Sequence, residues 1–374
     1  MSSRRSLLKS ATALVAASMI LPGVAYADEP MPVVATFSIL GDMVERIGGD
    51  HIALTTLVGP DGDAHVYQPT PQDAAAVASA EVLFMNGLEF EGWLERLAEA
   101  APFDGEMVIA TLGVEAIEFE DDHDDHGDEH SDHDDHGDEE HAEGGEHDHD
   151  DHGEEEHAEG EDHDHGEEHA EGDDHDHGDE HAGHDDEEDH ADHHGHDHGV
   201  FDPHAWQTIE NALIYVDNIT AGLAKADPEN ASAYYENRSE YVAELEALDA
   251  EIDSMMASVP EDKRTVVTSH DAFGYLAEHY GMTFEAPQGL STESEASAAD
   301  VAALITQIRE EGISAVFVET VTDNRLIEQI ANETGAGIGG TLYSDALSGE
   351  DGPASTYIEM MMHNAMTLSE ALGS

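Results

Sequence analysis

Three histidines lie at places in the chain where a metal ion could be held. His65 lies between a predicted strand and a predicted helix, His204 lies just before a helix, and His270 lies where a strand meets its helix. Neutral imidazole is a common ligand for divalent transition metals. In open α/β sheets, ligands bind in the crevice outside the carboxyl ends of the strands. Each histidine alone could be a surface or capping residue, but three at equivalent junctions predict a shared metal site.

A tetrahedral zinc site needs a fourth ligand, and two carboxylates are candidates. Asp345 lies in a loop after a strand-like run, and we expect it to be the fourth ligand. Glu319 ends a predicted strand and is either a rival ligand or a group that supports a ligand from behind. Three imidazoles and one carboxylate suit Zn²⁺ better than Mn²⁺, which prefers more oxygen donors. Manganese and copper stay open as alternatives at this point.

Residues 120–199 form a tract unlike the rest of the chain. It holds 22 of the 28 histidines and 40 of the 88 acidic residues, with no Lys or Arg and no large apolar residue. Such a segment cannot bury enough apolar surface to offset the entropy of ordering, so we predict a disordered insertion. Imidazoles among carboxylates predict auxiliary metal binding there. The His-x-His pairs that we expect to take part are His147, His149, His163, His165, His175, His177, His196 and His198.

The three other histidines of the chain have ordinary settings. His51 starts a strand, His279 lies within a helix, and His363 lies in the last helix. We expect these three to have structural roles.

Strand and helix patterns alternate on both sides of the tract. Short apolar strands are predicted at 32–38, 52–58, 81–86 and 107–111, and again at 264–269, 282–285 and 313–319. Helical patterns follow them, among them 39–47, 90–100 and 206–225. This alternation predicts an α/β fold with two lobes, each a parallel sheet flanked by helices.

One long helical pattern separates the two lobes. Asp227 suits the helix N-cap and Pro228 the first turn, and the pattern runs to residue 257 without an internal Gly or Pro. We therefore predict an N-terminal lobe at 28–226 that carries the tract, a rigid linking helix at 227–257, and a C-terminal lobe at 258–374.

Residues 1–27 have the pattern of a secretory signal peptide. A basic start at Arg4, Arg5 and Lys9 precedes an apolar run and the cleavage site Ala25-Tyr26-Ala27. The paired arginines also resemble a twin-arginine signal, so the export route is either Sec or twin-arginine. Both routes predict a periplasmic protein.

Composition limits the classes of partner. The chain has 88 acidic residues against 11 basic ones, which makes nucleic acid and anionic membrane surfaces poor partners. It has no cysteine, so neither a disulfide nor an N-terminal lipid anchor on cysteine is expected. We expect a monomer.

Several motifs resemble the zinc- and manganese-binding solute-binding proteins of ABC importers. They are Asp63-Ala64-His65-Val66-Tyr67-Gln68-Pro69-Thr70-Pro71, Phe201-Asp202-Pro203-His204-Ala205-Trp206, the Asp227-Pro228-Glu229-Asn230-Ala231 helix opening, Ser269-His270-Asp271-Ala272-Phe273-Gly274-Tyr275, Gly289-Leu290-Ser291-Thr292-Glu293 and Leu342-Tyr343-Ser344-Asp345. The resemblance implies two lobes joined by one rigid helix, with ligands at His65, His204, His270 and Asp345. A His-rich insertion before the Asp-Pro-His motif resembles the zinc-specific branch.

This chain departs from some zinc-specific relatives in two ways. Ala64 stands where some of them carry an acidic residue, which adds weight to Asp345 as the fourth ligand. Some also have a disulfide in the C-terminal lobe, which a chain without cysteine cannot form.

These observations favour a periplasmic zinc receptor that captures Zn²⁺ between the lobes and delivers it to an inner-membrane ABC permease. The alternatives are a periplasmic zinc buffer or chaperone that relies on the His-rich tract, and a manganese receptor of the same family. A zinc hydrolase is disfavoured, because the chain has no His-Glu-x-x-His motif and four protein ligands would close the site to water.

Deletion of residues 121–199 separates the receptor from the buffer. We expect growth under zinc limitation to survive with slower zinc acquisition, because the tract only gathers metal. Growth as poor as that of a strain without the whole protein would make buffering the main task.

Overall fold

The computed structural model describes residues 29–118 and 201–373. The predicted signal peptide at 1–27 and the predicted disordered insertion at 120–199, with its auxiliary histidines, lie outside the described residues. The fold below concerns the two described segments alone.

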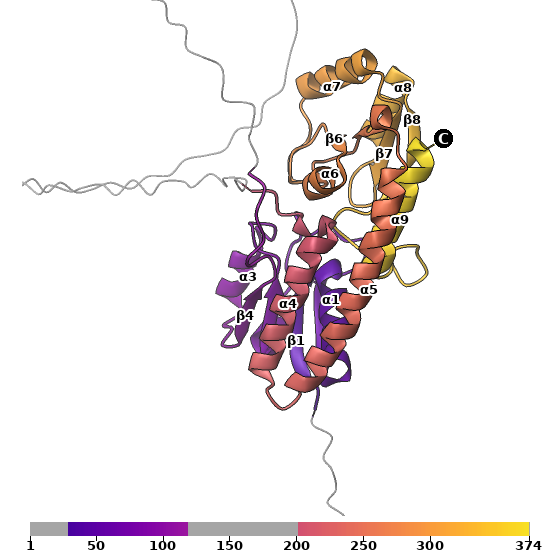
Figure 1. Cartoon of the computed structure of the whole chain (residues 1–374). Coiled ribbons are helices and arrows are strands. Elements are labelled where there is room, and N and C mark those ends of the chain that lie inside the picture. The colour runs from indigo at the N-terminus through magenta and orange to yellow at the C-terminus, as the bar shows by residue number, and fades with distance from the viewer. Residues whose placement is uncertain (1–28, 119–200, 374) are drawn as a thin grey trace, which may run out of the picture. The chain divides into compact units, whose positions relative to one another are not determined.

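The first lobe is a four-stranded parallel sheet in the order β2-β1-β3-β4 (Figure 1). Its strands are β1 (Met31–Phe37), β2 (Ile52–Val58), β3 (Val82–Met85) and β4 (Glu106–Ile109). Its helices are α1 (Ser38–Gly48), α2 (Pro71–Ser79), α3 (Leu94–Ala100) and α4 (Ile209–Ala226). The strands are almost continuously apolar because helices cover the sheet. Thr70 caps α2 as a capping box with Asp73, and Pro71 takes the first turn.

The second lobe repeats this plan. Its parallel sheet has the order β6-β5-β7-β8. The strands are β5 (Thr265–Val267), β6 (Thr283–Glu285), β7 (Ala315–Glu319) and β8 (Gly337–Leu342). The helices are α6 (Gly274–Tyr280), α7 (Ala298–Glu311), α8 (Arg325–Thr334) and α9 (Tyr357–Leu372). The predicted α/β class, with two helix-flanked parallel sheets, is confirmed.

The helix α5 (Ala231–Ala257) runs between the lobes (Figure 1). Its 27 residues span ~40 Å. It buries one side, including Tyr241, Leu245 and Ile252, and packs against α1, α4 and α9. One apolar core, built from both lobes, runs along it and includes Phe37 of β1 and Leu368 of α9. A second apolar cluster, which includes Ile308 and Ile330, fills the rest of the second lobe. The core that both lobes share resists large movements of one lobe against the other.

The long helix begins later than the sequence indicates. Asp227 ends α4 instead of capping α5, because its carboxylate accepts hydrogen bonds from the Asn230 N–H and the Tyr234 hydroxyl. Those bonds close a turn between the two helices. The helix predicted at 90–100 is also shorter, since α3 begins at Leu94. The division of the chain into domains at 226 and 258 stays a prediction.

No helix within the described part of the chain is long and apolar enough to span a membrane.

A carboxylate joins α1 of the first lobe to α9 of the second. Asp42 of α1 accepts a hydrogen bond of 2.9 Å from the Tyr357 N–H, at the first residue of α9. Free N–H groups at a helix start favour a negative charge. Burial nevertheless dominates and raises the pKa of Asp42 to about 6. At neutral pH the Asp42 carboxylate is therefore ionised in a buried position. This lowers the stability of the folded chain.

The Asp42→Asn variant tests this cost. A carboxyl group whose pKa is about 6 when folded and about 3.9 when unfolded makes the folded state lose stability as the pH rises between those values. Asparagine keeps the acceptor oxygen without the charge. We expect the variant to be more stable than the native chain by about 1–2 kcal/mol at pH 8, after allowance for solvent screening, with the gap closing near pH 4.

Urea unfolding with a chelator present, at both pH values, measures this difference. The exposed Asp50→Asn variant is the control and should show no such gap. A gap that is equal at both pH values would contradict the assignment to Asp42.

Candidate metal centre

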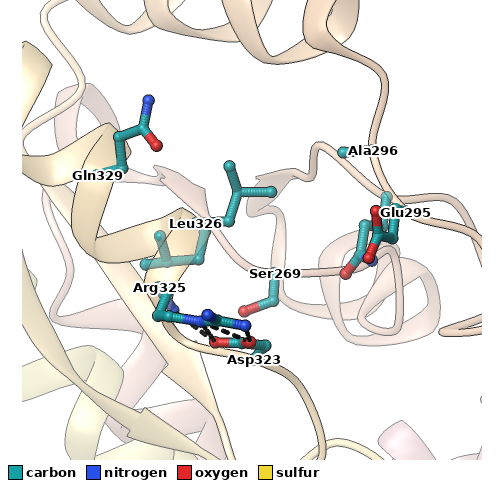
Figure 2. A pocket seen from close by; sticks show the side chains of 9 residues that line it. Ser269, Glu295, Ala296, Asp323, Arg325, Leu326 and Gln329 are labelled. Carbon is teal, nitrogen blue, oxygen red and sulfur yellow. Dashed lines mark hydrogen bonds and ion pairs between the residues drawn. The ribbon is translucent and has the colours of Figure 1, made fainter. Parts of the chain in front are cut away.

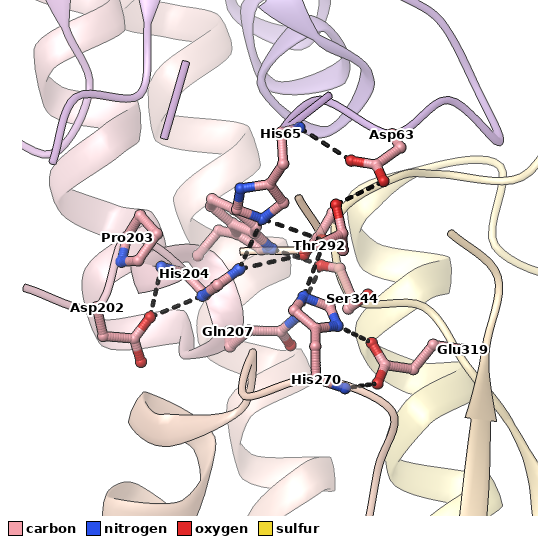
Figure 3. Close-up of polar contacts among 12 residues, drawn as sticks. Asp63, His65, Asp202, Pro203, His204, Gln207, His270, Thr292, Glu319 and Ser344 are labelled. Carbon is pink, nitrogen blue, oxygen red and sulfur yellow. Dashed lines mark hydrogen bonds and ion pairs between the residues drawn. The ribbon is translucent and has the colours of Figure 1, made fainter. Parts of the chain in front are cut away.

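Four side chains converge between the two sheets (Figure 3). They are His65, His204, His270 and Asp345, and their donor atoms all lie within 4.8 Å of one another. Asp345, His204 and His270 are fully buried and His65 is 7% exposed. The structure thus brings together all four residues that the sequence singled out as ligands.

Each of these residues lies in a loop at the edge of a sheet or at a helix start. His65 follows β2 and His270 follows β5, while Asp345 follows β8. His204 precedes the short 3₁₀ turn Ala205–Gln207 that leads into α4. The carboxyl ends of parallel strands meet at one edge, so loops far apart in sequence supply one site.

The donor atoms are spaced as a single ion requires. His65 Nε2 lies 3.3 Å from His204 Nε2. The Asp345 carboxylate lies 3.6 Å from His65 Nε2, 3.5 Å from His204 Nε2 and 3.1 Å from His270 Nε2. Tetrahedral ligands at Zn–N distances of about 2.0–2.1 Å are about 3.3–3.4 Å apart. The observed spacings of 3.1–3.6 Å bracket that value.

Carboxylates behind two of the imidazoles fix which nitrogen faces the centre. Asp202 Oδ1 lies 2.7 Å from His204 Nδ1 and also accepts the His204 N–H. Glu319 Oε2 lies 2.7 Å from His270 Nδ1, while its Oε1 accepts the N–H groups of Ser269 and His270. Such pairs orient the ring and leave Nε2 for the metal. Glu319 therefore supports a donor from behind and is not one of the four.

The Asp345 loop is tied to the first lobe. The Ser344 carbonyl accepts hydrogen bonds from Trp206 Nε1 and Gln207 Nε2, at 2.9 and 2.8 Å. The Leu347 N–H donates to Ser38 Oγ at 3.0 Å. Sequence reasoning did not find these anchors, because they join residues that are far apart in the chain.

Charge is unevenly shared in the centre. Burial lowers the pKa of His65 despite the nearby Asp345. Burial also opposes charge on His270, but the carboxylates of Glu319 and Asp345 outweigh it and hold that pKa well above its usual value. Burial would raise the pKa of Asp345, but His270 and His204 hold it well below. In the metal-free centre these contacts therefore favour the ionised form of Asp345 and the protonated form of His270.

The other described histidines lie apart from this centre. The His51 ring packs against Tyr234. His279 lies at about 4 Å from single oxygens of Glu210 and Asp249 through different ring nitrogens. His363 Nε2 lies 3.0 Å from the Thr341 carbonyl.

A cavity on the far side of Ser269 is separate from the four donors (Figure 2). It is lined by the start of α8 and the loop around Glu295, with an Asp323–Arg325 ion pair on its wall. Its lining contains none of the four donor residues.

The fold and the centre define a two-lobed protein with a buried site for one metal ion, and comparisons with known proteins place it. The family model of the periplasmic zinc-uptake complex component A matches residues 33–371. The chain belongs to this family of metal-binding periplasmic receptors of ABC importers. Members partner with a membrane permease and are not enzymes. The family prediction and the exclusion of an enzyme are both confirmed.

Curated relatives carry different metals in their names. The chain is 30% identical to the manganese-binding lipoprotein MntA of Bacillus subtilis over 351 residues, covering 92% of this chain and 91% of that protein. It is 28% identical to the iron-binding protein YfeA of Yersinia pestis over 341 residues, covering 91% and 86%.

Solved structures agree on the fold. A manganese-bound periplasmic metal-binding protein from Candidatus Liberibacter asiaticus superposes with a TM-score of 0.65 at 25% identity, covering 91% of this chain and 98% of that one. The periplasmic zinc-binding protein TroA from Treponema pallidum superposes with a TM-score of 0.69 at 23% identity, covering 92% and 100%. The family alone therefore leaves the metal undecided.

The Glu319→Gln variant tests how the centre distributes its charge. Removing the Glu319 charge should lower the pKa of His270, because Glu319 is the largest attraction that favours the charged imidazole. Nitrogen NMR of the imidazoles in metal-free protein, titrated in pH, measures the change. The Glu285→Gln variant removes a carboxylate at the end of the neighbouring strand β6 and serves as the control. A His270 titration that is unchanged by Glu319→Gln would contradict this account.

Proposed function

We propose that this protein is a periplasmic zinc receptor that binds one Zn²⁺ through His65, His204, His270 and Asp345 and delivers it to an ABC permease. The observation that carries the proposal is the convergence of three Nε2 atoms and one carboxylate in a buried site. Family membership supports the partnership with a permease.

The donor set favours zinc. Three nitrogens and a single carboxylate suit a borderline ion, whereas Mn²⁺ prefers more oxygen donors. Glu319, at the end of β7, contacts His270 and accepts hydrogen bonds from two N–H groups. Its carboxylate is therefore not free to become a further oxygen ligand. Burial also limits the water that could complete a six-coordinate shell.

A manganese receptor is the second candidate. Two observations favour it: the metal named for MntA, and the placement of both Asp345 oxygens toward the donors, which would allow bidentate ligation. A bidentate carboxylate raises the coordination number to five, closer to what Mn²⁺ accepts. The metal content of the chain purified from its native compartment separates the candidates.

Binding by this centre exchanges a proton for the metal. His270 must lose the proton on Nε2 before it can bind an ion, because only the neutral imidazole is a ligand. Metal affinity should therefore fall in acid, where protons compete for His270 and His65. The same exchange offers a release step at the permease, where a shift of the His270 loop would favour the Glu319–His270 ion pair over the metal.

We further propose that the chain is exported by its N-terminal segment, works as a monomer in the periplasm without a lipid anchor, and uses the His-rich tract as an auxiliary collector. The composition of residues 120–199 supports the last point. The zinc buffer or chaperone stays the alternative role for that tract.

Replacing His65, His204 and His270 together by Ala should remove one tight zinc equivalent per chain and leave the weak sites of the His-rich tract. Three ligands are lost, and Asp345 alone cannot hold the ion. Competition with a chromophoric chelator measures the number of tight equivalents. The matched control replaces His51, His279 and His363 by Ala and should keep the tight equivalent. A tight zinc that survives in the first variant would disprove the site.

Purified from its native compartment, the chain without residues 121–199 should carry zinc in the tight site, and elemental analysis measures the metal content. Competition in vitro does not separate the candidates, because Zn²⁺ binds most nitrogen and oxygen sites more tightly than Mn²⁺ whatever ion the protein carries in the cell. Manganese in that site would favour the second candidate and leave the location of the site intact.

A further inference from the structure

Aromatic rings pack against the side of the metal centre formed by His65 and His204, and Phe90 is the one that contacts both imidazoles. Phe90 is 1% exposed, and its ring packs edge-on against His65 with centroids 4.7 Å apart and against His204 with centroids 6.0 Å apart. The rings of Phe37 and Trp206 each lie 4.9 Å from the Phe90 ring, and Trp206 also packs against His204 with centroids 5.3 Å apart. A stack of aromatic rings therefore fills the space beside two of the four donor residues.

The chain reaches this position through an unusual turn. Gly87, Leu88 and Glu89 all have positive φ angles, of 90°, 52° and 61°. Two successive residues with side chains in the left-handed region are uncommon, because the Cβ atom then approaches the carbonyl oxygen. Such strain persists only where the surrounding structure imposes it, and it occurs often at functional sites.

A buried carboxylate imposes the turn. Glu91 accepts hydrogen bonds from the Thr36 hydroxyl at 2.6 Å and from the N–H groups of Asn86 and Gly87 at 2.7 and 3.3 Å. Two residues further on, Trp93 Nε1 donates to the Ala64 carbonyl, directly before His65. These contacts fix Phe90 relative to β1 and to the His65 loop.

The cover has a chemical consequence. A fully packed aromatic ring leaves no room for a water molecule between itself and the two imidazoles that it touches. Zinc is satisfied by four ligands in a closed site, whereas Mn²⁺ takes further oxygen ligands, which are usually water when the protein does not supply them. Excluding water from one side of the centre therefore disfavours Mn²⁺, which takes more ligands than Zn²⁺.

We propose that Phe90, held by the strained turn 87–89 and by Glu91, is a specificity-determining residue that keeps the bound metal four-coordinate and so favours Zn²⁺ over Mn²⁺. This inference rests on the proposed metal site and names how the site selects its ion. Simple core packing predicts a loss of stability on substitution, but no change in coordination number or in metal preference.

Substitution by Leu keeps an apolar side chain but opens space beside His65 and His204. With the full-length Phe90→Leu chain, we expect one equivalent of Co²⁺ to lose the intense visible absorption of four-coordinate cobalt and to gain the weak bands of five or six ligands. The ratio of zinc to manganese affinity should fall by about 10-fold, in the range found when groups around metal ligands are changed. Phe90→Met, whose flexible side chain can refill part of the space, should give a smaller change in the same direction.

The matched control is Phe84→Leu. Phe84 is also fully buried in the first lobe, on β3, and lies beside Gly222 of α4. This variant should lose stability yet keep the cobalt spectrum and the metal preference of the native chain. Circular dichroism shows whether each of the two variants is folded, and urea unfolding compares their losses of stability.

Two results would overturn the proposal. One is a Co²⁺ spectrum of the native chain that already shows five or six ligands. This result does not depend on whether any variant folds. The other is an unchanged spectrum and an unchanged zinc-to-manganese ratio in Phe90→Leu. Failure of the metal site itself is recognised separately, because the native Co²⁺ spectrum would then survive replacement of His65, His204 and His270.

Discussion

A carboxylate with no exposed surface is the constraint on which the described structure depends. Asp345 is fully buried, and an isolated ionised group in such a place would be costly unless positive charge compensates it. His270 supplies that charge in the metal-free protein, and a divalent cation would supply more. The loops must therefore bring imidazoles from both lobes to within 3.1–3.6 Å of one aspartate. A ligand that neutralises the centre stabilises the whole arrangement by mass action.

The two lobes hold this centre unequally. His65 and His204 belong to the first lobe, and the Asp345 loop is tied to the same lobe through Ser344 and Leu347. His270 is held instead by Glu319, at the end of β7 in the second sheet. The shared core along α5 resists large rotations between lobes.

Several side chains around the four candidate donors set the surroundings in which a metal would bind. Asp202 and Glu319 orient the imidazoles, and Phe90 fills space beside two of them. None of these three groups is itself among the four donors. Relatives of this fold are named for manganese, iron or zinc, and the proposed role of Phe90 would let the metal preference change without a change of ligand.

The sequence by itself determined the α/β class, the long helix and the four candidate donors, because apolar periodicity and short loop motifs are local features. It left open whether Glu319 is a ligand, and it placed Phe90 at the start of a helix. The role of Glu319 and the position of Phe90 both depend on contacts between segments far apart in the chain. The contacts of Glu319 with His270 and Ser269 across the second sheet occupy its carboxylate, so it is not one of the four candidate donors. Phe90 is turned toward His65 by Glu91, whose partner Thr36 lies on another strand. Only tertiary packing decides such contacts, because their free energy appears when the sheets and loops have come together.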